Sequence, residues 1–306
     1  ESSIRSLVAD GETVLNVSVG AFGDLYHKMA EVNGKKNAQL KFEYGQAIDL
    51  NVLEDKLKEV RPAVVTFTHN ETSTGVKNDI VAVTKLIRQY GAMPLVDGVS
   101  IFGGANIQLN EAGPAMYSTA TQKSMGLPAG FGIGFVSQEA EDKAKSVTNK
   151  GHSSDINTQL GRARKFQTVT TPNCTLANMM HTQLDYIVND EGVKNRFARH
   201  EAMRLMVGEW AKGIDGFELF APEGYGSPTL TTVLCPAGVT SAHLKKGVKE
   251  AMRGKGYLMD PGYGKLNTAM EEAGQRLVIR IGHMGDITPE MLTTYLTDLK
   301  PELEKL

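Results

Sequence analysis

The chain has 306 residues, of which 41% are hydrophobic and 22% charged, a composition that is typical of a folded globular protein and excludes a disordered one. Its 33 Lys and Arg residues against 35 Asp and Glu residues give a net charge of -2, which offers no electrostatic attraction to nucleic acid or an acidic membrane surface. The two cysteines, Cys174 and Cys235, are far apart, so we expect neither a disulfide framework nor a zinc site, but a protein of a reducing compartment, the cytoplasm.

The first half of the chain alternates between short apolar, β-branched segments and segments whose apolar residues have helical spacing. The apolar segments, which we predict to be buried strands, are Val14–Val19, Val64–Phe67, Pro94–Asp97 and Ala115–Ser118. Helical spacing covers Asn51–Val60 and Asp79–Tyr90. Because parallel strands need crossover connections, which helices usually provide, this alternation predicts an α/β fold with a mostly parallel central sheet sandwiched by helices.

The second half has a different pattern. A long helix, or two helices with a break at Glu191 and Gly192, is predicted from Asn173 to about Lys212. A helical stretch and a glycine-rich loop then separate three predicted strands; these segments are Phe217–Phe220, Leu230–Leu234, Ser241–Arg253, Gly254–Gly264 and Leu277–Ile281. We therefore predict a large domain over residues 1–205 and a smaller C-terminal α+β domain over residues 206–306. No apolar run is long enough to cross a bilayer, so we expect no membrane partner.

Lys123 is the first candidate for a catalytic residue. It lies within Thr119–Gly130, just after a predicted buried strand and before a run rich in glycine and proline. A partly desolvated lysine loses some of its preference for the charged ammonium, which is what an amine needs to form a Schiff base. The residues alone leave open a second interpretation, in which Lys123 extends from a surface loop into solvent.

Asp97 is the second candidate, because it stands at the carboxyl end of the apolar strand Pro94–Asp97. A buried carboxylate is costly unless a cation or a hydrogen-bond donor accompanies it. A protonated pyridine nitrogen would be such a partner, and the charged ring could then accept electrons from a substrate carbanion. The alternative is that Asp97 only caps the next turn.

Two further features are weaker by themselves. The segment Thr68–Gly75 places many hydrogen-bonding side chains at another strand end, as solvated turns also do. Arg280 is set into the otherwise apolar strand Leu277–Ile281. A guanidinium in that position is suited to bind a substrate carboxylate through two hydrogen bonds.

The order of these features is that of a known family. Over essentially its whole length, the chain resembles the class V branch of fold-type I pyridoxal-phosphate enzymes, specifically the alanine or serine to glyoxylate or pyruvate aminotransferases. The motifs that carry the resemblance are His69–Gly75, Val96–Ser100, Gln122–Lys123 followed by Pro128–Gly130, Thr171–Pro172, and Arg280–Gly285.

The resemblance implies that the cofactor is pyridoxal 5'-phosphate and that Lys123 holds it as a Schiff base. Lys123 would also move the proton between the substrate α-carbon and the cofactor. Asp97 would pair with the pyridine nitrogen, Val99 would pack on one face of the ring, and Phe22 would occupy the other face.

The resemblance also assigns the remaining contacts. Thr72 would bond the phenolic oxygen of the ring, and Gln122 would help to hold the phosphate. Thr170 would reach the phosphate of a neighbouring subunit, so a homodimer with shared active sites is implied. Arg280 would bind the α-carboxylate. The expected reaction is a ping-pong transfer of an amino group from alanine or serine to glyoxylate or pyruvate, with no metal.

The chain departs from the family pattern in two places. The family has a Ser-Gly-rich turn that holds the phosphate, and Glu1–Val8 resembles the end of the helix that follows this turn, so we expect the family's N-terminal segment to be missing from this chain. In addition, Gln167 stands where a tyrosine often contacts the neighbour's phosphate.

Several alternatives remain open from the sequence. A cysteine desulfurase-like lyase of the same fold would have His at the position of Gln122 and a reactive Cys on a mobile loop, which neither Cys174 nor Cys235 provides. A 2-aminoethylphosphonate transaminase has the same fold and would bind a phosphonate in place of the α-carboxylate. A non-catalytic, aminotransferase-like subunit is the alternative of another class. The glycines of Gly130–Gly134 lead into a predicted strand, which argues against dinucleotide binding.

Overall fold

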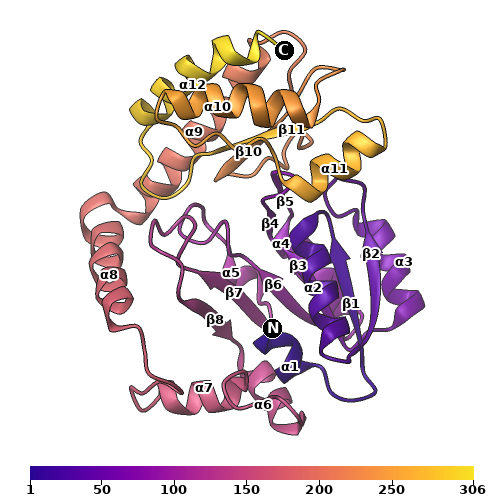
Figure 1. The fold of residues 1–306 in the computed structure, drawn as a ribbon. Coiled ribbons are helices and arrows are strands. Elements are labelled where there is room, and N and C mark those ends of the chain that lie inside the picture. Colours follow the sequence, from indigo (N-terminus) through magenta and orange to yellow (C-terminus); the bar gives the residue numbers. More distant parts are fainter.

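A computed structural model describes all residues from 1 to 306 and consists of two domains (Figure 1). A six-stranded sheet forms the centre of the large domain, in the order β2-β1-β3-β6-β7-β8. The strands are β1 (Thr13–Ser18), β2 (Lys36–Lys41), β3 (Val64–Thr68), β6 (Met93–Asp97), β7 (Met116–Ala120) and β8 (Gly132–Val136). All neighbouring strands are parallel except β7 and β8, which are antiparallel. The predicted mostly parallel sheet is therefore confirmed.

Helices cover both faces of this sheet. Successive residues of a strand point to opposite faces, so a strand of apolar residues needs a covering layer on each side. Leu15 of β1 belongs to a cluster of 15 buried residues that α3 and α4 complete on one face, whereas Val14 belongs to a cluster of 14 with α1, α2 and α6 on the other. Burying side chains of this size contributes about 1.5–3 kcal/mol each. The helices of the large domain are α1 (Ser2–Leu7), α2 (Ala21–Val32), α3 (Leu50–Val60), α4 (Ile80–Gln89), α5 (Leu109–Ala112), α6 (Gln138–Ser146) and α7 (Ile156–Ala163).

A long helical segment leads from the large domain to the small one. It consists of α8 (Cys174–Asp185), a π-helical segment (Tyr186–Glu191) and α9 (Val193–Lys212). The side chain of Asn173 caps the start of α8 by accepting a hydrogen bond from the Leu176 N–H at 3.0 Å. Gly192, with φ of 79°, separates the π-helical segment from α9. The predicted break at Glu191 and Gly192 is thus confirmed.

In the small domain, helices pack on a three-stranded antiparallel sheet whose strand order is β11-β10-β9. Its core is a cluster of 22 buried residues, among them Val233 of β10 and Leu299 of α12. The elements are β9 (Glu218–Leu219), β10 (Leu230–Leu234), a π-helical segment (His243–Val248), α10 (Lys249–Gly254), α11 (Gly264–Glu272), β11 (Val278–Gly282) and α12 (Pro289–Leu303). The strand predicted over Phe217–Phe220 is shorter than expected, and α11 was not predicted.

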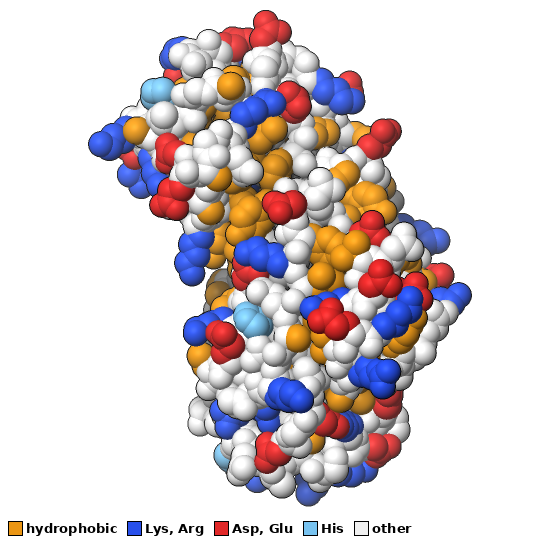
Figure 2. Space-filling model, turned by 90° about the vertical axis from the view of Figure 1, so that its right-hand side faces the viewer, with side chains coloured by type: hydrophobic (Ala, Val, Ile, Leu, Met, Phe, Trp, Pro, Cys, Tyr) orange, Lys and Arg blue, Asp and Glu red, His pale blue; other side chains and the backbone are white.

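A short hairpin, β4 (Asn70–Glu71) and β5 (Val76–Lys77), joins the two domains. The Lys77 N–H donates to the Tyr225 carbonyl at 2.7 Å, and the Ser227 N–H donates to the Gly75 carbonyl at 2.9 Å. Figure 2 shows hydrophobic side chains gathered along the junction of the two domains on one side of the molecule. The predicted boundary between residues 205 and 206 lies inside α9. No helix combines the length and the apolar character that a membrane span requires.

Candidate active site

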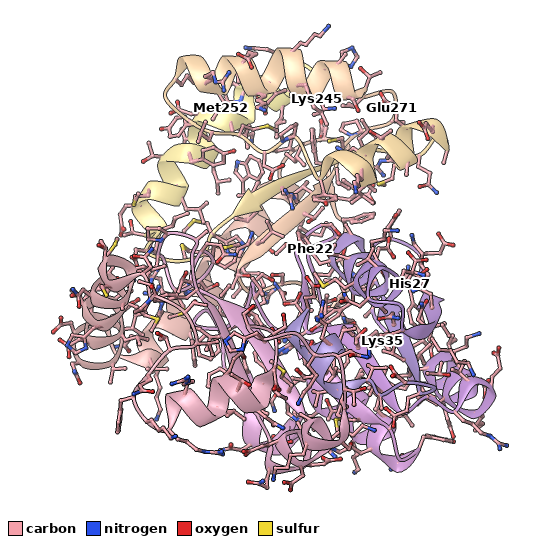
Figure 3. All side chains as sticks on the ribbon, turned by 60° about the horizontal axis from the view of Figure 1, so that its bottom comes forward. Phe22, His27, Lys35, Lys245, Met252 and Glu271 are labelled. Carbon is pink, nitrogen blue, oxygen red and sulfur yellow. The ribbon has the colours of Figure 1, made fainter.

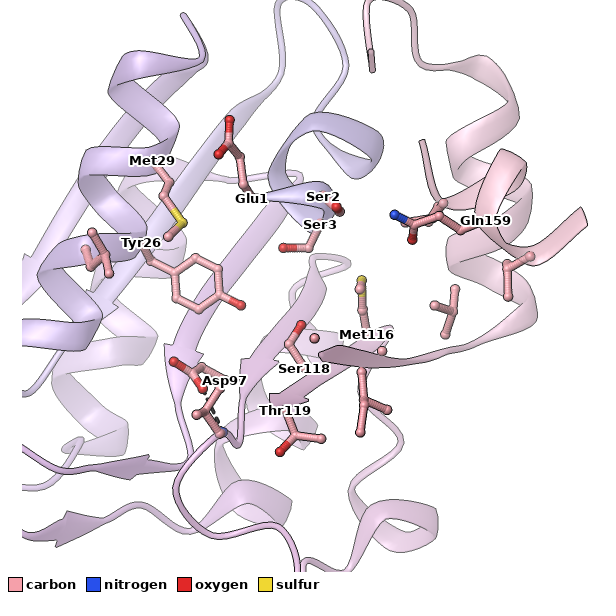
Figure 4. A pocket seen from close by; sticks show the side chains of 18 of the residues that line it. Glu1, Ser2, Ser3, Tyr26, Met29, Asp97, Met116, Ser118, Thr119 and Gln159 are labelled. Carbon is pink, nitrogen blue, oxygen red and sulfur yellow. Dashed lines mark hydrogen bonds between the residues drawn. The ribbon is translucent and has the colours of Figure 1, made fainter. Parts of the chain in front are cut away.

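Asp97 ends strand β6 and points into a cavity of about 430 Å³ in the large domain (Figure 4). One carboxylate oxygen accepts a hydrogen bond from the Val99 N–H at 2.8 Å, and this is the only hydrogen bond of the side chain. Burial raises the pKa of the Asp97 carboxyl, while the Val99 N–H acts in the opposite direction. Asp97 is therefore a largely buried acid whose second oxygen lacks a partner.

Phe22 lines the same cavity as Asp97 and Val99. It lies in the first turn of α2, and Figure 3 shows it at the junction between the domains. The carboxylate of Glu71 fixes this turn by accepting from the N–H groups of Phe22 and Gly23 at 3.0 and 3.1 Å. The first N–H groups of a helix have no partner within the helix, and Glu71 provides one for α2. Glu71 therefore caps a helix that begins 50 residues earlier in the sequence, at Ala21.

Lys123 lies on the loop that follows β7, and its half-buried amine makes no hydrogen bond or ion pair within the chain. Burial lowers the pKa of this amine, and the positive charge of Arg280 acts in the same direction. The carboxylates of Asp260 and Asp97 partly oppose that shift. The Lys123 amine thus has no partner within the chain, and the charges of Asp97 and Arg280 act on it. Burial and the Arg280 charge favour its neutral, nucleophilic form.

Arg280 of β11 is mostly buried and connects the two domains at the site. Its Nη1 donates to the Thr72 carbonyl at 2.9 Å, and its Nη2 forms an ion pair with the Asp260 carboxylate at 2.6 Å. The Tyr263 ring lies 5.6 Å from the guanidinium and 5.7 Å from the Phe22 ring, centroid to centroid in the second case. Aromatic rings at such distances stabilise a cation and fix its orientation.

The remaining predicted residues occupy different environments. Thr72 is buried beside Arg280, and its hydroxyl makes no hydrogen bond within the chain. Gln122 and Thr170 are exposed, and neither side chain makes a hydrogen bond. The structure therefore brings Phe22, Asp97 and Val99 together at one cavity, and links Lys123 to Asp97 and Arg280 by charge. It shows no direct contact of Gln122 or Thr170 with these residues.

Pyridoxal phosphate, the expected cofactor, fits this set of residues. A protonated aromatic nitrogen would supply the cationic donor that the second oxygen of Asp97 lacks. Phe22 and Val99 give the same cavity apolar sides against which a planar ring can pack. Lys123 supplies the free amine.

Two residues of the site were not found from the sequence. Tyr26 lines the same cavity as Asp97, as Figure 4 shows, and burial, followed by the Asp97 charge, raises the pKa of its hydroxyl. The signal that could have found it is the helical spacing of Phe22, Leu25, Tyr26 and Met29, which places these side chains on one face of a helix. Asp260 was interpreted as part of a glycine-rich loop, and its only signal is the turn sequence Asp260–Gly262.

Comparison with known proteins adds independent evidence. A model of the class-V aminotransferase family matches residues 3–254. The serine–glyoxylate aminotransferase of Hyphomicrobium methylovorum is 30% identical over 311 residues, which cover 95% of this chain and 71% of that protein.

Two solved structures superpose on 99% of this chain. An alanine–glyoxylate aminotransferase from Nostoc sp. shares 28% identity, has a TM-score of 0.83 and is covered over 77% of its own length. A pyridoxamine–pyruvate aminotransferase from Mesorhizobium loti shares 27% identity, has a TM-score of 0.86 and is covered over 76% of its length.

Proposed function

The chain belongs to the class-V aminotransferases, a family of pyridoxal-phosphate enzymes, and from this premise we propose that it moves an amino group from a small amino acid to a 2-oxo acid. Alanine or serine is the donor, and glyoxylate or pyruvate is the acceptor. The two half-reactions follow each other in a ping-pong order at one site. The names of the relatives, which pair serine, alanine or pyridoxamine with glyoxylate or pyruvate, support this choice.

The observation that carries the proposal is the combination of a buried acid and a free amine. Asp97 keeps one oxygen without a partner at the cavity, and Lys123 has an amine that no other residue engages. The arrangement of Asp97 is unfavourable in a purely structural role, because largely buried carboxylates are normally paired. The half-buried Lys123 amine is marked by its lack of a partner and by its lowered pKa. Both groups acquire a partner when the cofactor binds.

Each residue has a defined task in this reaction. The bound cofactor supplies an electron sink for the carbanion formed at the α-carbon of the substrate. Asp97 would hold the proton on the ring nitrogen, and Phe22 and Val99, which line the same cavity, would hold the ring. Lys123 carries the proton to and from the α-carbon, for which a lowered pKa is suited.

Other side chains hold the ends of the ligands. Thr72 bonds the phenolic oxygen of the ring, and Gln122 contributes to phosphate binding. Arg280 binds the α-carboxylate with its planar guanidinium.

We propose a homodimer in which Thr170 reaches the phosphate of the partner's site. Thr170 lies on an exposed segment, and the neighbouring Phe166 has a fully exposed ring, with a relative exposure of 100%. The Thr170 side chain, which makes no hydrogen bond within the chain, is therefore accessible to a second subunit. We place the enzyme in the cytoplasm, where both of its free cysteines would stay reduced.

The cysteines do not support the lyase alternative. Cys235 is buried, and burial raises the pKa of its thiol to about 12, so that it cannot act as a thiolate near neutral pH. Cys174 is exposed, but it begins helix α8 and is not part of a loop.

The decisive experiment is visible absorption spectroscopy of the purified chain with added pyridoxal phosphate. Alanine should bleach the absorption band of the bound cofactor, and pyruvate or glyoxylate should restore it. Lys123→Ala should remove the band and abolish turnover without unfolding the protein. Lys35→Ala, which changes a half-buried lysine outside the site, is the matched control and should behave like the unmodified chain. A cofactor band that does not depend on Lys123 would refute the assignment.

A further inference from the structure

Arg280 is already engaged by a carboxylate of its own chain. Of its three nitrogens, Nη2 donates to Asp260 at 2.6 Å, Nη1 donates to the Thr72 carbonyl at 2.9 Å, and Nε is buried without a partner. A substrate carboxylate that approaches this guanidinium must displace Asp260 from Nη2 or move the groups that bury Nε. In either position, the Asp260 carboxylate is the immediate neighbour of the bound anion.

Asp260 is held in this place by the backbone around it. Its second carboxylate oxygen accepts from the Gly262 N–H at 2.9 Å, and its carbonyl accepts from the Arg280 N–H at 3.3 Å. Gly262 has a φ of 92°, and a Cβ there would lie 2.2 Å from the Val278 carbonyl oxygen, so only glycine permits this loop to run so close to β11. The loop is therefore fixed beside Arg280.

The negative charge of Asp260 acts on the whole site. It raises the pKa of Lys123 against the effect of burial, and together with burial it raises the pKa of Tyr295 to about 12. Asp260 and Arg280 also line a second cavity, of about 470 Å³, in which Arg280 is the only cationic residue. A second negative charge on a substrate would thus face Asp260 and find no cation to pair with.

We propose that Asp260 is a specificity-determining residue that restricts the site to substrates with a single carboxylate. Asp260 reduces the positive charge that Arg280 offers to a substrate. The charge that remains is enough to bind one carboxylate. Substrates with more negative charge, such as dicarboxylic amino acids and aminophosphonates, are disfavoured by repulsion from Asp260. The inference deepens the proposed function and rests on it.

The test compares alanine with aspartate as donors, and pyruvate with oxaloacetate as acceptors, in the unmodified enzyme and in Asp260→Asn. Asn removes the charge but keeps an oxygen that can accept from the Gly262 N–H. The kcat/KM ratio of alanine to aspartate should fall by at least about tenfold in the variant, because like-charge contacts at a binding site carry large penalties. The change should appear mainly in the KM for aspartate, and the ratio of pyruvate to oxaloacetate should fall in parallel, because both half-reactions use Arg280.

Asp215→Asn is the matched control, since it makes the same charge change in the small domain at an exposed residue that lines neither cavity. It should leave both ratios unchanged. Asp260→Ser should lower them as Asp260→Asn does, which separates the effect of charge from that of the amide group. Unchanged ratios in an active Asp260→Asn enzyme would overturn this inference alone, whereas an unmodified enzyme that does not respond to alanine would overturn the proposed function itself.

Discussion

Asp97 is a residue that is unfavourable for the fold by itself and that we propose to serve the reaction. Its carboxyl has one hydrogen bond and a pKa that burial raises, so the apo chain favours its protonated form more than an exposed acid would. A bound cationic ring would reverse this preference, because opposite charges in a desolvated site attract strongly. The residue is thus prepared for a partner that the fold itself does not supply.

Replacing Asp97 with Asn tests this role. Asn has nearly the same shape and can still accept the hydrogen bond from the Val99 N–H, but it cannot hold a proton on the ring nitrogen by charge. We expect kcat for the alanine–pyruvate reaction to fall by about 10²-fold or more, as is usual when a preorganised electrostatic group is lost. Steady-state kinetics and circular dichroism would check the rate and the fold.

Asp24→Asn provides a control for the loss of one negative charge in the large domain. Asp24 forms an ion pair with Lys41 at 2.9 Å and lies outside the cavity. The control should keep nearly full activity. An Asp97→Asn enzyme with the kcat of the unmodified chain would contradict the proposed role.

At the scale of elements, buried periodic segments could be predicted and those that depend on distant partners could not. The strands β1, β3 and β6 are continuous apolar runs because helices cover both faces of the sheet. Helix α2 has apolar residues at helical spacing, but no residue next to its start signals a cap, because Glu71 supplies the cap from far along the chain. Strand β2 was missed because it is an edge strand with a polar sequence.

The same distinction applies to the site. Asp97 ends strand β6, and Lys123 lies on the loop after β7. Because functional residues gather at the carboxyl ends of parallel strands, the strand positions alone predict that both belong to the site. Asp260 reaches Arg280 only because its loop runs alongside β11, which is a tertiary arrangement. No spacing in the sequence could have indicated that pairing.

Arg196, in the first turn of α9, connects the loop that carries Lys123 with the small domain. Its fully buried side chain donates to the Ser124 carbonyl at 2.7 Å, directly after Lys123. It also donates to the carboxylates of Glu191 at 2.6 Å and Asp286 at 3.0 Å. One guanidinium thus ties together three segments that are far apart in sequence.

We predict that Arg196→Ala lowers the free energy of unfolding by about 3–5 kcal/mol, because it removes a fully buried guanidinium from its ion pair with Glu191 and leaves the buried Ser124 carbonyl without a donor. Arg204→Ala on the same helix removes a more exposed pair with Glu201 and should cost at most about 1 kcal/mol. Urea denaturation of both variants would measure the difference. If both variants lost the same free energy of unfolding, the buried contacts of Arg196 would contribute no more to stability than the exposed pair of Arg204.

At the scale of the whole molecule, three buried histidines link the stability of the fold to pH. Burial is the main cause that lowers the pKa of His69 and of His283 to about 3 and that of His200 to about 4. They lie in the large domain, in α9 and beside β11, so both domains are involved. Burial acts in the opposite direction on Glu71, whose pKa it raises to about 6.

The sign of the histidine effect follows from where the protons bind. Below about pH 6.5 the unfolded chain takes up protons on these histidines, whereas the folded chain does not, so the free energy of unfolding falls as the pH falls from about 6.5 toward 4. Each histidine contributes a slope of up to about 1.4 kcal/mol per pH unit in that window. Glu71 opposes them between about pH 6 and 4.5, because its raised pKa favours the folded state at low pH.

His200→Gln should therefore flatten the decline, by about 1.4 kcal/mol per pH unit between pH 6 and 5, even though it destabilises the protein at neutral pH by disturbing a buried contact with the Arg196 carbonyl. His152→Gln, at an exposed position, should leave the slope as it is. Urea denaturation at closely spaced pH values would measure both slopes. An unchanged slope of the free energy of unfolding against pH in His200→Gln would contradict this prediction. It would mean that the His200 imidazole has the same pKa in the folded and unfolded states and that other groups cause the acid sensitivity.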